Sequence, residues 1–478
     1  MKNIKRFLLI GLATILVFTA CETTGSATKG GNTAYVKENS AQISETTLDN
    51  GIKLIVKKQK TNRIYSIRVN YNGGNALTPD GKDGIEALTL STMLAASKKY
   101  AHDDVETILH KTTSNMGSGT GLDMAWATFN TLDKYWDEAS DVFFDCLVNP
   151  LFDKDDFAMN AKDADSAWAK DNADQEALTI NGLLKKSRAG HPYGKQTVPT
   201  SDSLKNISLD DVKAWHKEKL TPNRMFVVAV GNFNINKLKA QLNNTLGKIP
   251  ANKTEIPEVP PMNLKPALYT QEFPTAQGVA MIRGDYEIPN RLSPDFTKLQ
   301  LAYSILYDLL FQTVRTEHGA CYSVWARVHG FHQSYGSMFI YKTTKPSEAK
   351  RYFDEAVALL ASGKTIKLKD DGTNNKYAKL SDTIETYKAR YISSFFSSQY
   401  ANAEIASQIA YNYYYKNDPT SYLHIIGEIN ATTAEDIVQV INRYLVNAKV
   451  SWMVCADKAT LNQLDKSVFN GFTGKVEK

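Results

Sequence analysis

Three side chains that could bind a metal recur at four-residue intervals within one predicted helix, namely His102, Glu106 and His110. Residues four apart lie on one face of a helix, and imidazole and carboxylate groups are common metal ligands. The outer two positions are two full turns apart, about 12 Å of helix rise, so the three cannot share one ion. We interpret the segment as the solvated face of an amphipathic helix.

The cysteines and the other histidines do not supply a metal site either. Outside the first 40 residues there are three cysteines and no CxxC pair, and an odd number makes no disulfide framework. Cys146 lies in an apolar helical pattern and Cys455 in an apolar strand pattern, so both are predicted to be buried. His318, His329 and His332 are neighbours in sequence, but the expected turn and strand end need not bring them together.

A guanidinium and a phenol stand seven residues apart in the second half of the chain, at Arg315 and Tyr322. Both groups donate hydrogen bonds, and donors aimed at an oxyanion that develops during a reaction can lower its barrier by several kcal/mol. On residue type alone the simpler interpretation is structural, with Arg315 capping a helix C-terminus and Tyr322 packed in a strand.

Glycine alternates with other residues around Ser118, Gly119 and Thr120, between Gly117 and Gly121. Such a stretch could cradle a phosphate, but the lysine and the following helix that a phosphate-binding loop requires are missing. We therefore expect a strand that its glycines weaken.

The elements that must position these residues form two similar halves. Ser208 and Thr433 each begin a capping box, followed by a helix and an apolar strand that starts 17 residues after the cap, at Met225 and Val450. Equal spacing indicates an internal repeat, and a coincidence between two common helix–strand units is the alternative. Asn50-Gly51 between apolar runs predicts a hairpin.

Prolines cluster between the two halves and predict an extended connector. Strand and helix patterns alternate irregularly, so we expect an α+β protein. We place a first domain at 41–248, the connector at 249–266 and a second domain at 267–478. A net charge of +5 without a long basic run argues against nucleic-acid binding.

The first 40 residues are typical of an export signal. A basic start, an apolar run and the small Ala20 predict a bacterial lipoprotein signal peptide at 1–20, with Cys21 lipidated and 21–40 as a flexible tether. An ordinary secretory signal with a chance cysteine is the alternative. We expect a lipid-anchored protein of the bacterial cell envelope that faces the periplasm and contacts the membrane only through its anchor.

An ordered set of motifs, spread roughly from Thr46 to Cys455, resembles the insulinase/pitrilysin family of zinc peptidases. The motifs are Leu48-Asp49-Asn50-Gly51, the helix after Asp83-Gly84, the loop 191–194, the helix–strand unit after Ser208, and the segment 310–324. The resemblance implies the half-size form of the family. Its two homologous α+β domains are each a mostly antiparallel sheet with helices packed on one face.

The zinc motif of that family is degenerate in this sequence. Active members carry His-x-x-Glu-His, which supplies two metal ligands and the base that activates water. Here Ala87 and Ser91 take the histidine positions and Leu90 takes the glutamate position. Methyl and isobutyl groups have no donor atoms, a hydroxyl is a poor zinc ligand, and a third-ligand carboxylate near Asp165 cannot hold zinc alone. The resemblance therefore implies that this chain binds no cofactor.

The same resemblance assigns roles to the residues that remain. Arg315 and Tyr322 match the pair that binds the substrate carbonyl, and Ser118, Gly119 and Thr120 match an edge strand that holds an extended peptide. This implies the non-metal subunit of a heterodimeric peptidase, whose partner is a zinc-bearing paralogue with an intact motif. Two alternatives stay open: an inert pseudo-peptidase that acts as a peptide-binding or scaffold lipoprotein, and a stand-alone zinc peptidase.

Overall fold

The first of two large sheets is built from the first half of the chain in the computed structural model, which describes residues 29–367 and 376–476. Its strand order is β1-β2-β6-β3-β5-β4. β2 and β6 run parallel, and the other neighbours run antiparallel. The strands are β1 (Ile43–Thr47), β2 (Lys53–Lys58), β3 (Ile64–Asn72), β4 (Asn115–Thr120), β5 (Met124–Leu132) and β6 (Met225–Gly231).

The second large sheet has the order β7-β13-β8-β10-β9. β7 and β13 run parallel, and the other neighbours run antiparallel. The strands are β7 (Ala267–Glu272), β8 (Ala280–Glu287), β9 (Ser323–His329), β10 (Tyr335–Thr343) and β13 (Val450–Ala456), and β11 (Lys364–Ile366) pairs separately with β12 (Tyr377–Lys379).

The helices follow the same order in both halves. The first half contains α2 (Ile85–Ala95), α3 (His102–Thr112), α4 (Trp136–Val148), α5 (Lys154–Asn172), α6 (Gln175–Ser187), α7 (Ser201–Leu204), α8 (Leu209–Lys219) and α9 (Ile235–Asn243). The second half contains α10 (Asp295–Leu310), α11 (Pro346–Ala361), α12 (Leu380–Ser398), α13 (Asn402–Lys416), α14 (Ile425–Ala431), α15 (Ala434–Ile441) and α16 (Lys458–Asn462).

The two halves share one topology. Strands β2-β6-β3-β5-β4 correspond in order and direction to β7-β13-β8-β10-β9, and β1 is an addition that forms the predicted hairpin with β2. Helices α4–α8 lie between β5 and β6, as α11–α15 lie between β10 and β13. Both predicted capping boxes are present, because Ser208 and Asp211 bond each other's backbone N–H, as do Thr433 and Asp436. The α+β class and the repeat are confirmed.

Each sheet packs one apolar face against helices of its own half. In the first half, alternate residues such as Val69 and Phe129 join Phe143 of α4 in one core. In the second half, Ile282 and Leu306 belong to the corresponding core with α10 and α11. Both Cys146 and Cys455 are fully buried, as predicted.

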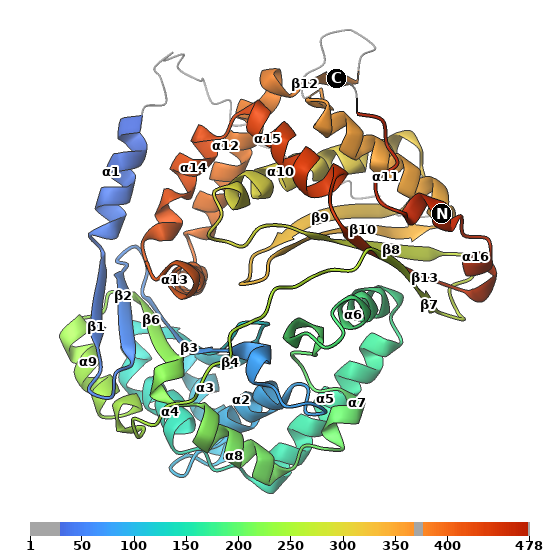
Figure 1. Ribbon diagram of the computed structural model, residues 1–478. Helices are drawn as coiled ribbons and strands as arrows, with labels where there is room; N and C mark the ends of the chain where they lie inside the picture. Colours follow the sequence, from blue (N-terminus) through green and yellow to red (C-terminus); the bar gives the residue numbers. More distant parts are fainter. Residues whose placement is uncertain (1–28, 368–375, 477–478) are drawn as a thin grey trace, which may run out of the picture.

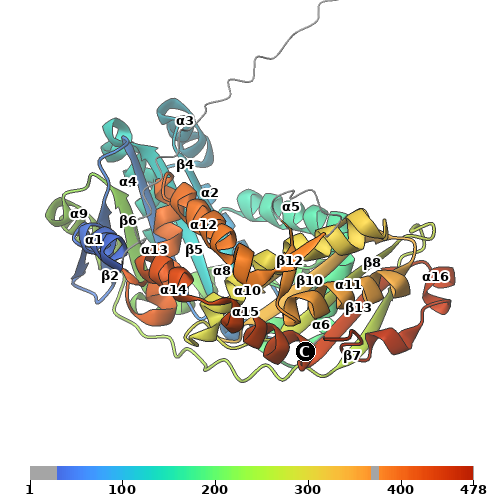
Figure 2. The ribbon, with the colours of Figure 1, turned by 90° about the horizontal axis from the view of Figure 1, so that it is seen from above.

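The second face of each sheet is covered by a helix from the other half, which the sequence did not predict. Helix α6 lies under β13 and β8 (Figure 1), where the Gln175 amide donates to the carbonyls of Val279 and Cys455 at 2.9 and 2.8 Å. Helix α13 lies over β3 and β6 (Figure 2) and packs Ile405 and Ile409 against Val228. The halves are therefore interlocked.

A buried carboxylate adds polar contacts between the halves. Asp123, only 1% exposed, lies in the turn between β4 and β5. Its side chain accepts hydrogen bonds from the Tyr415 hydroxyl at 2.7 Å, the backbone N–H of His332 at 2.9 Å and the Tyr193 hydroxyl. The Tyr414 hydroxyl donates to its backbone carbonyl at 3.1 Å. Because buried charges must be hydrogen-bonded, Asp123 fixes α13 against the first sheet.

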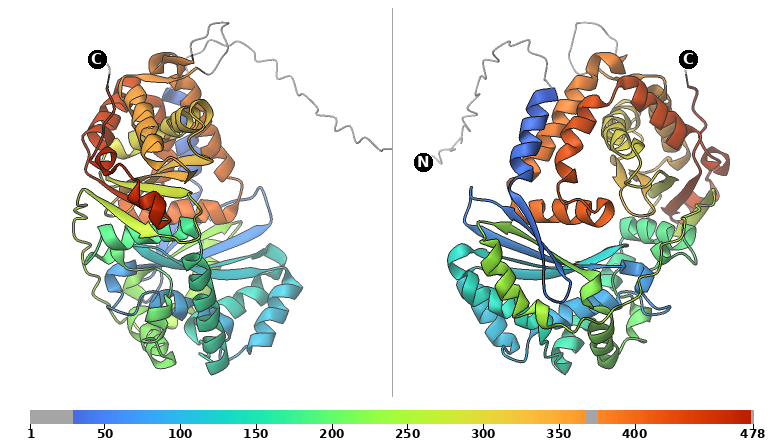
Figure 3. Two further views of the ribbon diagram at one scale, coloured as in Figure 1. Left: turned by 90° about the vertical axis from the view of Figure 1, so that its right-hand side faces the viewer. Right: turned by 60° about the vertical axis from the view of Figure 1, so that its left-hand side comes forward.

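The predicted tether is wrong for its second part. Residues Lys29–Ser40 form helix α1, which stands beside α14 (blue beside orange in Figure 3). Tyr35 packs edge-on against Phe396 with ring centroids 5.3 Å apart, and this apolar contact anchors the helix. Cys21 and the signal peptide lie outside the described residues. Within those residues, every helix is too short or too polar to be a membrane span.

Candidate functional site

Helix α2 is held in place by a buried ion pair next to the degenerate motif. Glu86 accepts a hydrogen bond from Arg224 Nη2 at 2.6 Å, and both side chains are buried. The other guanidinium nitrogens donate to the carbonyls of Asn72 and Lys219, each at 2.6 Å. The arginine therefore joins α2 to the end of β3 and to α8.

The side chains at the motif positions on α2 offer no free polar atom that could bind a metal. Leu90 is fully buried in the first core, while Ala87 and Ser91 are half-buried. The Ser91 hydroxyl donates to the carbonyl of Leu88 at 3.1 Å, one turn back in the same helix. Residue type and local bonding thus both leave α2 without a metal ligand.

The carboxylate and histidine candidates are engaged elsewhere. Asp165 is exposed on α5 and accepts a hydrogen bond from the Ser201 hydroxyl at 2.5 Å. His102 begins α3, where its Nδ1 lies 2.8 Å from Asp156 Oδ1. No group of three or more His, Cys, Asp or Glu side chains in the described part of the chain is arranged to hold a metal ion.

Strand β4 contains the predicted edge residues and lies at the edge of the first sheet. The Trp126 indole packs across Gly119, where a Cβ atom would come within 2.6 Å of the ring. The Thr120 hydroxyl donates to the Thr197 carbonyl at 2.7 Å. This bond joins the end of the strand to the loop between α6 and α7. On its outer side β4 pairs with no strand among the described residues, so its backbone is positioned to add one.

Arg315 and Tyr322 lie together on the surface of the second half. Arg315 is part of a π-helical turn, Phe311–Glu317, that continues α10, and Tyr322 directly precedes β9. The guanidinium carbon is 4.6 Å from the Phe311 ring centroid and 5.5 Å from that of Tyr322. Tyr322 is 65% exposed, and Arg315 has no carboxylate within 4.0 Å in the described structure. The structural roles that residue type suggested, a helix cap and a packed strand residue, are not the ones observed.

An unpredicted row of rings and cations leads away from this pair across β9 and β10. We call it the aromatic ladder; it runs through Arg327, Trp325, Phe339, Tyr341, Tyr322 and Arg315. Trp325 and Phe339 stack with centroids 5.0 Å apart, and Tyr341 and Tyr322 are 6.0 Å apart. The period-two spacing of Tyr335, Phe339 and Tyr341 in β10 is the signal that could have revealed part of it. Phe339 is buried, but Trp325 and Tyr341 are partly exposed, so the ladder adds two rings suited to apolar side chains beside the exposed pair.

Buried charges lie beside the ladder, where the two halves meet. Asp285 of β8 pairs with Arg283 at 2.7 Å and with Arg188, which follows α6, at 2.9 Å. Burial raises the pKa of Asp285, but the two guanidinium groups outweigh it and leave that pKa below its usual value. His329 bonds the Ser337 hydroxyl at 2.6 Å, and burial together with the charge of Arg283 lowers the pKa of this imidazole to about 4.

The lowered pKa of His329 predicts a loss of stability in acid. Between about pH 6.5 and pH 4 the unfolded chain binds a proton at this position that the folded chain does not, so stability falls as pH falls. The loss amounts to about 3 kcal/mol by pH 4. Urea unfolding at pH 7.0 and pH 4.5 checks it: H329N should reduce the pH dependence, and H110Q, on exposed α3, should not. An unchanged pH dependence in H329N would contradict the assignment.

Comparison with known proteins gives two family matches along the chain. The model described as "Insulinase (Peptidase family M16)" matches residues 53–201. The model described as "Peptidase M16 inactive domain" matches residues 206–367. Together the two segments cover well over half of the chain.

Individual relatives are distant but span much of the chain. "Non-peptidase homolog YmxG" of Helicobacter pylori is 23% identical over 268 residues, which is 55% of this chain and 61%, less than two thirds, of that protein. "Uncharacterized zinc protease YmxG" of Bacillus subtilis is 21% identical over 352 residues, or 70% of this chain and 80% of that protein. A crystal structure of a peptidase M16 inactive domain from Pseudomonas fluorescens has a TM-score of 0.75 at 16% identity, covers 87% of this chain and 98% of that one, and shares its fold.

Proposed function

Because the chain belongs to the insulinase family (peptidase family M16), we propose that it is a member without a zinc site that serves as the non-metal subunit of a heteromeric peptidase. The observation that carries the proposal is the contrast between two parts of the molecule. Ala87, Leu90 and Ser91 leave α2 without the motif's ligands, whereas Arg315 and Tyr322 are exposed and have no acceptor among the described residues. A partner with an intact His-x-x-Glu-His helix would supply the metal chemistry.

Arg315 and Tyr322 then act in trans on a peptide held at the partner. The guanidinium and the phenol donate hydrogen bonds to the oxygen of the scissile carbonyl and bind it most tightly when that oxygen becomes an oxyanion. The outer edge of β4, at Ser118, Gly119 and Thr120, would pair with an extended peptide backbone. The aromatic ladder favours apolar side chains next to the bond that is cleaved.

The proposed subunit is a lipoprotein of the bacterial envelope. The basic, apolar and small-residue pattern of residues 1–20 supports export, and Cys21 is the residue that would carry the lipid. Helix α1 would then begin only a few residues after the anchor and keep the globular part close to the membrane surface.

Reconstitution with a zinc-bearing paralogue from the same organism tests the proposal. The purified chain alone should hold no zinc after dialysis and should not cleave a fluorogenic peptide. Addition of the paralogue should give chelator-sensitive cleavage that neither chain shows alone. Stoichiometric zinc and chelator-sensitive cleavage by this chain alone would overturn the proposal.

A peptide-binding scaffold is the second candidate, and the unpaired outer edge of β4 is the observation that favours it. In that case the chain would bind unfolded peptides with the same affinity whether or not the paralogue is present. Mixing the two proteins would leave the paralogue's cleavage rate unchanged.

A further inference from the structure

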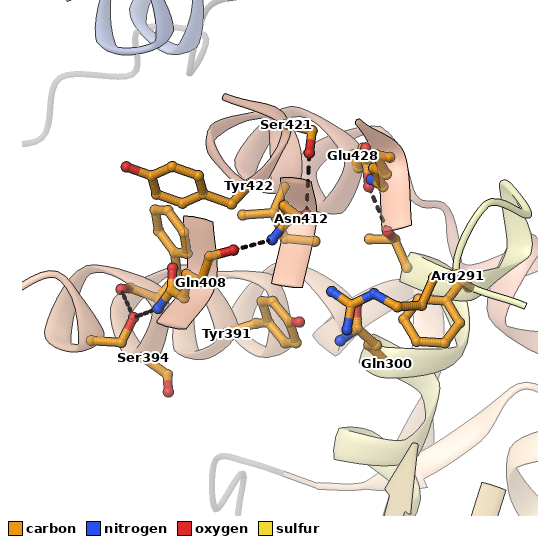
Figure 4. Close-up of a pocket in the computed structure, with 15 residues that line it drawn as sticks. Arg291, Gln300, Tyr391, Ser394, Gln408, Asn412, Ser421, Tyr422 and Glu428 are labelled. Atoms are coloured by element: carbon orange, nitrogen blue, oxygen red, sulfur yellow. Dashed lines mark hydrogen bonds between the residues drawn. The ribbon is translucent and has the colours of Figure 1, made fainter. Parts of the chain in front are cut away.

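A polar cavity of about 350 Å³ lies between α10, α12, α13 and α14. None of its lining residues belongs to β4 or to the aromatic ladder. Figure 4 shows its walls: Gln300 comes from α10, Tyr391 and Ser394 from α12, and Gln408 and Asn412 from α13. The volume falls at the lower end of the range for small-molecule sites. Amides and hydroxyls, which can donate to a ligand, make up most of the polar lining.

Arg291 points into this cavity without an acceptor. Its guanidinium lies towards Tyr391 and Asn412 (Figure 4), and within the described residues it has no hydrogen bond and no carboxylate within 4.0 Å. Its neighbours are the rings of Tyr415 and Phe296, 5.2 and 5.6 Å from the guanidinium carbon. Burial lowers the pKa of Arg291 from its ordinary value because no carboxylate compensates for the lost hydration. Arginine side chains that lose much of their hydration are normally paired with an acid, and the half-buried Arg291 has no such partner among the described residues.

A second cation lines the same space. Lys416, at the end of α13, borders both this cavity and an adjoining hollow of about 370 Å³, and the two share Arg291, Thr297 and Glu428. Neither cation forms an ion pair in the described structure. Glu428, the one carboxylate that lines the cavity, accepts a hydrogen bond from the Thr297 hydroxyl at 2.5 Å. The lining therefore has an excess of positive charge and of hydrogen-bond donors.

We propose that this cavity binds a small organic anion, with its carboxylate or phosphate group on Arg291 and Lys416 and its body against the wall formed by the contacting rings of Phe395 and Tyr422. A guanidinium binds either oxyanion through two parallel N–H donors, and the ammonium adds a point charge. The ligand would connect α13, which covers the first sheet, to α10 and α12 of the second half. Its binding would therefore stabilise the interlocked halves as one unit.

Thermal unfolding with simple probes tests the site. Phenyl phosphate, benzoate, inorganic phosphate, benzamide and benzylamine are each added to the purified chain at one ionic strength. At about 100 times Kd, phenyl phosphate or benzoate should raise the Tm by about 3 °C, while benzamide and benzylamine should not. Comparison of the two aromatic anions shows whether the site prefers phosphate or carboxylate.

Three variants decide whether the stabilisation comes from this cavity. R291Q should weaken anion binding by at least about 10-fold without lowering the Tm of the unliganded chain, because it removes a half-buried charge that no carboxylate compensates. K416Q should weaken binding less, and it carries the test if R291Q does not fold. R443Q, at an exposed ion pair on the surface, should bind like wild type. The proposal is overturned if no anion stabilises the chain. It is also overturned if the anions stabilise R291Q and K416Q as much as they stabilise the wild-type chain.

Discussion

Replacing Arg315 by alanine in the reconstituted heteromer should lower kcat by about 10²–10³-fold, as expected for the loss of one donor to an oxyanion. Y322F removes only the phenol hydroxyl and should act in the same direction. Arg315 has no carboxylate partner in the part of the chain that the structure describes, and Tyr322 is 65% exposed, so neither substitution disturbs the core of this chain. The loss should fall mainly on kcat, because the donors bind the transition state more tightly than the substrate.

The matched control is R63A, which removes an exposed arginine that pairs with Asp133 far from the ladder. It should leave the cleavage rate unchanged, and all three variants should still bind the paralogue in size-exclusion chromatography. A heteromer that forms normally with R315A and Y322F and cleaves peptide at the wild-type rate would exclude a catalytic role for the pair. A rise in KM alone would instead indicate ordinary substrate binding.

The substitution D123A should lower the free energy of unfolding by about 4 kcal/mol, because it leaves several buried donors without an acceptor. The carboxylate of Asp123 joins Tyr193, His332 and Tyr415, which come from both halves of the chain. Asparagine at this position keeps one acceptor oxygen and should restore part of the loss. Equilibrium unfolding in urea measures the free energy of unfolding of the wild-type chain, D123A and D123N.

A second carboxylate provides the control. Asp165 also accepts a hydroxyl hydrogen bond, from Ser201, but it is exposed on α5. D165A should therefore stay within about 0.5 kcal/mol of wild type. If D123A and D165A unfold at the same urea concentration, the buried contacts of Asp123 contribute nothing to the stability of the folded chain.

Local patterns were sufficient to predict the α+β class and the repeat, whereas the mostly antiparallel sheet of each half was implied by the family resemblance. The boxes at Ser208 and Thr433 and the Asn50-Gly51 turn act over a few residues, so sequence alone reveals them. The repeat followed from equal spacing of these signals. Residue type alone suggested a helix cap for Arg315, and the π-helical turn that presents its side chain was not predicted.

Features that depend on distant partners were not predicted. Asp123 is one polar residue in a turn, and its partners lie 70 to 292 residues away in the chain. Arg291 gives no local sign that its guanidinium lacks an acceptor, because that requires the positions of α12, α13 and α14. Helix α1 follows a stretch rich in Gly, Ser and Thr, and its order depends on tertiary contacts such as Tyr35 on Phe396 and the Lys57 ammonium on Asn39.

The interlocked helices α6 and α13 occupy equivalent places in the two halves, and each covers equivalent strands of the other. Two identical chains of half this length could make the same contacts about a two-fold axis, each lending one helix to its neighbour. Gene duplication and fusion of such a symmetric pair accounts for both the repeat and the crossing of helices. A fragment that ends within 249–266 would keep α6 without the second sheet that it covers, and the first sheet without α13. Two apolar surfaces would then be exposed to solvent.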